Sequence, residues 1–110
     1  MATGKGKGIR EVAFVDCSGG GQVVVEKNIA YVGNMGSPDG TIILDVSDPN
    51  NPRELARLGM LPGTHSHKVR VANNLMLVNR EFVSPQLAPS SFRGGLGIYD
   101  VSTPSQPKLI

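Results

Sequence analysis

The stretch GTIILDVSDPNNP at Gly40–Pro52 decides the fold, because it returns in altered form as GLGIYDVSTPSQP at Gly95–Pro107. Each copy is an aliphatic run followed by Asp-Val-Ser-x-Pro-x-x-Pro. Proline cannot donate a hydrogen bond to a sheet, so the strand in each copy must end before Pro49 or Pro104. An internal repeat of this kind predicts an architecture of stacked copies of one unit.

The repeat extends upstream of these two segments. Residues 23–32 match residues 69–78 at an offset of 46 residues, whereas the Asp-Val-Ser segments are 55 residues apart. The second copy therefore carries nine extra residues, which lie within Glu81–Gly94. Such an insertion forms a loop on one face of a repeat protein, often the face that binds ligands. A partial third match, between residues 10–15 and 53–58, predicts a strand of a preceding unit at Glu11–Val15.

Each unit is predicted to contain four short strands, because β-branched or aliphatic runs alternate with turn residues. The predicted strands are Gln22–Glu26, Ile29–Asn34, Thr41–Val46 and Glu54–Leu58 in the first unit, and Lys68–Ala72, Leu75–Arg80 and Leu96–Val101 in the second. Tight hairpin turns are expected at residues 26–28 and 72–74, where Asn tolerates left-handed backbone angles. The three successive valines at 23–25 do not alternate with polar residues, which predicts a strand buried on both faces.

Four-stranded units that repeat at about 40–50 residues are typical of β-propeller blades. The predicted fold class is therefore all-β, with antiparallel four-stranded β-propeller blades, about two of them, in an incomplete ring. In detail, residues 1–9 are predicted to be a flexible N-terminal arm, and residues 10–21 the last strand of a preceding blade with its connecting loop. Residues 22–66 form the first blade and its connection, and residues 67–110 a second blade truncated in its last strand.

The run ILDVSDPNNP within the first copy closely resembles the LVIVD repeat, whose units end in Asp-Val-Ser-x-Pro-x-x-Pro. The segment HKVRV at His67–Val71 also resembles the first strand of that repeat, which commonly opens His-x-Val-x-Val. The resemblance implies a β-propeller from a family whose members are often extracytoplasmic. Gly21 stands where the first blade would carry the family's His, so the resemblance does not imply one His ligand for each blade.

Two blades leave sheet edges and blade faces without neighbours. The expected partners are the remaining blades of a longer parent chain or, alternatively, other copies of this chain; a protein or small-molecule ligand is a further expectation. The charge balance, 11 basic against 9 acidic residues, does not favour nucleic acid. No apolar run is long enough to predict a membrane span, and no signal peptide is recognisable, so the localisation stays unknown. Cys17 has no second cysteine with which to form a disulfide.

The two histidines of the chain lie together in Gly63–His67, in the connection between the blades. Residues i and i+2 of an extended chain point to the same side, and imidazole is the commonest metal ligand of proteins. His65 and His67 are therefore the candidate metal ligands, with a transition metal as the one cofactor to expect if any is bound. The alternative is a hydrogen-bonding His beside a solvated one.

Arg80 ends a strand before the long insertion and is a candidate contact for a carboxylate or phosphate; its alternative is a surface pair with Glu81. No Ser-His-Asp triad can be assembled. The function predicted first is therefore a binding or scaffold module without catalysis of its own. The alternative is part of a metal-binding or metalloenzyme propeller that uses His65 and His67.

Overall fold

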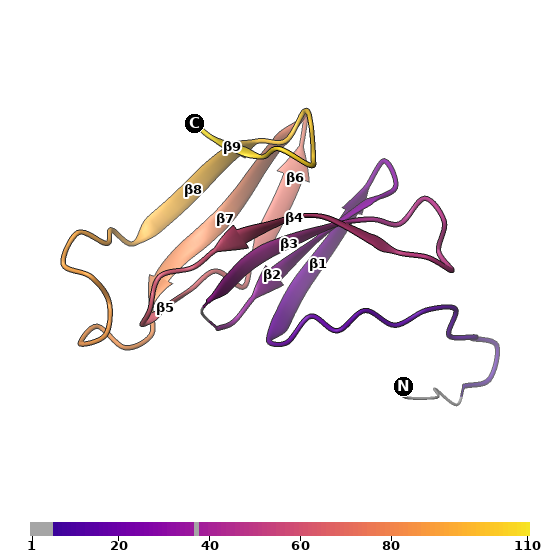
Figure 1. Ribbon diagram of the computed structural model, residues 1–110, viewed down its shortest axis with the longest axis horizontal. Coiled ribbons are helices and arrows are strands. Elements are labelled where there is room, and N and C mark those ends of the chain that lie inside the picture. The colour runs from indigo at the N-terminus through magenta and orange to yellow at the C-terminus, as the bar shows by residue number, and fades with distance from the viewer. Residues whose placement is uncertain (1–5, 37) are drawn as a thin grey trace.

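The first sheet forms from residues 20–59 and contains four antiparallel strands in sequence order (Figure 1). In this computed structural model, which describes residues 6–36 and 38–110, the strands are β1 (Gly20–Glu26), β2 (Ile29–Asn34), β3 (Asp39–Asp45) and β4 (Arg53–Gly59). The predicted hairpin turn between β1 and β2 is present, and Lys27 and Asn28 adopt φ values of 51° and 64°. Positive φ at both positions is what a two-residue turn needs to follow the twist of the strands.

The second sheet repeats this plan with one break. Its strands are β5 (Thr64–His65), β6 (Val69–Ala72), β7 (Leu75–Phe82), β8 (Gly95–Asp100) and β9 (Lys108–Leu109). Both β5 and β6 pair with β7, so together they take the place of one first strand. Asn73 and Asn74 repeat the turn geometry, with φ values of 52° and 64°. The all-β fold, with two antiparallel propeller blades of an incomplete ring, is thus confirmed.

The main core lies between the two blades. Tyr31 and Ile43 of the first sheet pack against buried side chains of the second. Those side chains are Val69, Met76, Val78 and Val101. Burying each large apolar side chain contributes about 1.5–3 kcal/mol, so this cluster stabilises the packing of one blade on the other.

Equivalent positions of the repeat differ in burial between the two blades. Leu77 and Ile98 stand in the second blade where Tyr31 and Ile43 stand in the first, since the offsets are 46 and 55 residues. Ile43 has no exposed surface, but Ile98 is 37% exposed because no described blade covers it. The second blade therefore presents the face that the first blade buries.

Two strand predictions are wrong in part. No strand forms at Glu11–Val15, because both sheets are built from other segments and a strand exists only through its pairing. Val23 and Val25 are 57% and 61% exposed, because β1 is an edge strand whose burial alternates along the chain. Apart from that strand, the division into an arm, a connecting segment and two blades stays a prediction, and residues 1–5 lie outside the described residues. No helix long and apolar enough to cross a membrane occurs in the part of the chain that the structure describes.

Candidate metal centre

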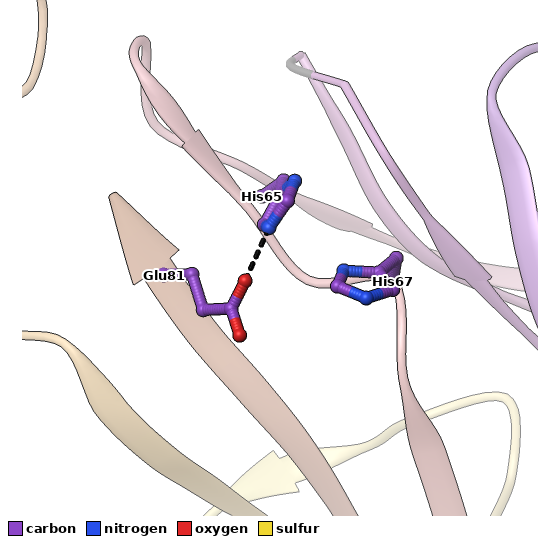
Figure 2. A group of neighbouring side chains, drawn as sticks. All are labelled: His65, His67 and Glu81. Carbon is purple, nitrogen blue, oxygen red and sulfur yellow. Dashed lines mark hydrogen bonds and ion pairs between the residues drawn. The ribbon is translucent and has the colours of Figure 1, made fainter. Parts of the chain in front are cut away.

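The candidate site lies where the chain is interrupted between β5 and β6. β5 pairs with the end of β7, and its register sets His65 opposite Glu81. Directly opposed residues of an antiparallel pair carry their side chains on the same face. Figure 2 shows the result, in which the ring of His65 meets the carboxylate of Glu81 and the ring of His67 lies beside them.

Three potential ligand atoms converge in this site. One ring nitrogen of each histidine and one carboxylate oxygen of Glu81 all lie within 4.8 Å of one another. His65 Nε2 is hydrogen bonded to Glu81 Oε2. The two imidazole rings are 4.5 Å apart between centroids and meet edge to face at 65°. The His65 side chain is 16% exposed and that of Glu81 is 48% exposed, so the cluster opens to solvent on the glutamate side.

The first blade holds His67 in place. The His67 carbonyl accepts a hydrogen bond of 3.0 Å from the backbone N–H of Gln22 in β1. Gly33 of β2 packs so closely that a Cβ there would lie 2.3 Å from the same carbonyl oxygen. The Nδ1 atom of His67 is buried and has no hydrogen-bond partner among the described residues. A buried ring nitrogen without a partner is costly, and a ligand would relieve that cost.

The charge of Glu81 suits a cation. The hydrogen bond with His65 lowers the pKa of the Glu81 carboxyl, and the Asn79 side chain and the charges of His65 and His67 lower it further. The carboxylate is therefore ionised at neutral pH, as a metal ligand must be.

Two imidazoles and one carboxylate form a ligand set known from zinc sites. Ligands at about 2.1 Å from a tetrahedral zinc ion are about 3.4 Å from one another. Atoms that lie within 4.8 Å therefore need small side-chain rotations to coordinate one ion. The fourth position would remain for water, because three protein ligands are present.

Arg80 lies apart from this cluster. It precedes Glu81 in β7, and successive strand residues point to opposite faces. Its guanidinium carbon lies 5.4 Å from the centroid of the Phe92 ring. Both residues lie in β7, where Glu81 contacts His65, and both interpretations of Arg80, as a ligand contact or as part of a surface pair, stay predictions.

Cys17 is not part of the site either. It packs against a second apolar cluster formed by Ala30, Ile42 and Leu44. Burial is the main cause that raises the pKa of its thiol, so the reactive thiolate is disfavoured at neutral pH.

The sequence did not identify Glu81 as a ligand candidate, because the strand was predicted to end at Arg80. β7 continues to Phe82, where Thr64 pairs with it. The signal was available: a strand two residues longer, paired with the segment around His65, places Glu81 opposite that histidine.

The LVIVD repeat family matches residues 20–58 and 91–110, which is just over half of the chain. The matched segments cover the first blade and the end of the second. They leave out residues 59–90, which carry both histidines and Glu81. No curated protein and no solved structure matches the chain.

Proposed function

The chain belongs to the LVIVD-repeat family, and from that premise we propose that it is a β-propeller module that binds one divalent transition-metal ion, zinc above all, through His65, His67 and Glu81. The observation that carries the proposal is the convergence of these three donors within 4.8 Å. They come from two strands and the linker between β5 and β6, so the tertiary fold is needed to bring them together.

Zinc is favoured because imidazole and carboxylate both suit it and because it imposes no geometry of its own. The site also has a backbone frame that does not depend on the ion. His65 is fixed by pairing with β7, and His67 by the contact with β1 and β2. A frame of this kind lowers the cost of ordering the ligands on binding.

The rival function is a binding or scaffold module in which the His65–Glu81 pair only ties β5 to β7. Both functions predict that the loss of Glu81 weakens this tie. They differ in metal content, because only the first predicts a stoichiometric ion. Metalloenzyme activity at the open fourth position is the further alternative, and the proposal is limited to binding.

A zinc titration of the untagged, chelator-treated full chain separates the two. Calorimetry should detect one zinc ion per chain. His65→Ala, His67→Ala and Glu81→Gln should each weaken binding at least tenfold, because each removes one of only three protein ligands. Glu26→Gln is the matched control, because Glu26 ends β1 on the side away from Gln22, which contacts His67. This variant should bind zinc as the unmodified chain does. Circular dichroism confirms that each variant is folded.

Two results would defeat the proposal. One is the absence of stoichiometric zinc at micromolar concentrations in the folded, unmodified chain. The other is zinc bound equally well by a folded variant that lacks both histidines.

A further inference from the structure

A cavity of about 70 Å³ lies between the blades, on the side of β7 that carries Arg80. Its walls come from the start of β3, the connection from β4 to β5, β7, and the long loop that follows β7. The nine-residue insertion thus contributes a wall, because Phe92 belongs to that loop.

Two residues that line this cavity, Thr41 and Ser66, carry buried hydroxyl groups without partners among the described residues. Thr41 is 1% exposed and Ser66 is 9% exposed. Neither Thr41 Oγ1 nor Ser66 Oγ forms a hydrogen bond within the described residues. Another hydroxyl of the wall, Thr64 Oγ1, donates a 2.7 Å bond to the Leu61 carbonyl. Buried hydroxyls normally have partners, but both of these oxygens have almost no accessible surface and do not face the open space of the cavity.

Arg80 brings the only permanent charge to the cavity wall. Its guanidinium forms no ion pair within residues 6–36 and 38–110. In the same residues, three arginine–carboxylate pairs and the His65–Glu81 contact are formed. The Phe92 ring forms a cation–π contact with the guanidinium. A half-buried arginine with free donors is suited to bind a carboxylate through two parallel hydrogen bonds.

We propose that this cavity binds a short aliphatic carboxylate, with the guanidinium of Arg80 holding the carboxylate. A monoanion fits better than phosphate because one arginine neutralises one charge. Leu58, Val78 and Phe92 offer apolar wall for a short alkyl chain. His65 also lines this cavity, but Arg80, which holds the carboxylate, is not a proposed metal ligand, so the inference does not rest on the proposed function.

The alternative occupant is ordered water, which commonly satisfies buried polar groups. Nuclear magnetic resonance titration of the full, metal-free chain distinguishes the two. Propionate should shift the amide signals of residues around Thr41, Ser66 and Arg80 in a saturable manner. Propionamide, which has the same shape without the charge, should not.

Variants assign the binding to the cavity. Arg80→Gln should weaken propionate binding at least tenfold. Arg93→Gln is the matched control, because Arg93 lies next to Phe92 in the long loop but is not part of the cavity wall. It should leave the affinity unchanged.

Several results would overturn the inference. These are equal binding of propionamide and propionate, stronger binding of inorganic phosphate than of propionate, and unchanged affinity in a folded Arg80→Gln variant. Binding of propionate only after zinc is added, with no effect of Arg80→Gln, would place the carboxylate on the metal and would also overturn it.

Discussion

Replacing Ile43 with Ala should destabilise the chain far more than replacing Ile98, although both residues hold the same place in the repeat. Ile43 is fully buried between the blades, whereas Ile98 is 37% exposed on the outer face of the second blade. The two substitutions are otherwise matched, because each is an Ile to Ala change in the third strand of a blade.

The magnitudes follow from the burial. The substitution removes three side-chain carbons, and each is worth about 0.8 kcal/mol when fully buried, or about 2.4 kcal/mol in all. The cavity left at Ile43 adds about 1 kcal/mol, for a total of about 3–4 kcal/mol. At Ile98 about two thirds of that transfer term applies and solvent fills the space, so the loss is about 1.5 kcal/mol. The expected difference in the free energy of unfolding is therefore about 2 kcal/mol.

Urea unfolding of both variants measures this difference, provided that the slope of free energy against urea is the same for each. Light scattering after size exclusion gives the oligomeric state at the same concentration. Equal losses in a monomeric chain would refute the assignment of Ile43 to the inter-blade core. Equal losses in an oligomer would instead show that another copy covers Ile98.

Two further predictions concern the turns and the contact between the blades. Gly33→Ala should lower the free energy of unfolding by at least about 2 kcal/mol and weaken zinc binding, because its Cβ would strike the His67 backbone. Gly36→Ala is the control, because no atom lies near a Cβ at that position. Equal unfolding midpoints for the two variants would contradict the packing of Gly33 against His67. Asp45→Asn should lower stability at neutral pH, since hydrogen bonds from Ser47 and then Arg53 lower the pKa of the Asp45 carboxyl. That contribution is complete above the unfolded carboxyl pKa of about 3.9 and is lost as the pH falls through the lowered value in the folded chain. Unfolding curves of variant and parent should therefore converge in acid, and a constant gap at all pH values would argue against the carboxylate.

The strand order could be predicted from the sequence because proline and asparagine fix where strands stop and turn. Pro49 and Pro104 cannot extend a ladder, and Asn28 and Asn74 adopt the left-handed angles that the hairpins need. Burial was harder to predict, because it depends on which strands have neighbours. Val23 and Val25 are apolar but lie on an edge strand.

The candidate site was predictable only in part. The two histidines were recognisable because they are close in the sequence. Glu81 is 16 residues from His65 and became a neighbour only through the short β5–β7 pairing. The unpartnered hydroxyls of Thr41 and Ser66 could not be anticipated either, because their burial results from the packing of one blade on the other.

The zinc-edge X-ray absorption spectrum of the folded, zinc-loaded chain tests the metal centre most directly. Two imidazole nitrogens are expected at about 2.0–2.1 Å and oxygen ligands at about 2.0–2.2 Å from one zinc ion. Removal of either histidine should delete one imidazole contribution. A spectrum with only oxygen ligands, or one unchanged in a folded His65→Ala His67→Ala variant, would contradict the assignment of His65, His67 and Glu81 as a metal centre.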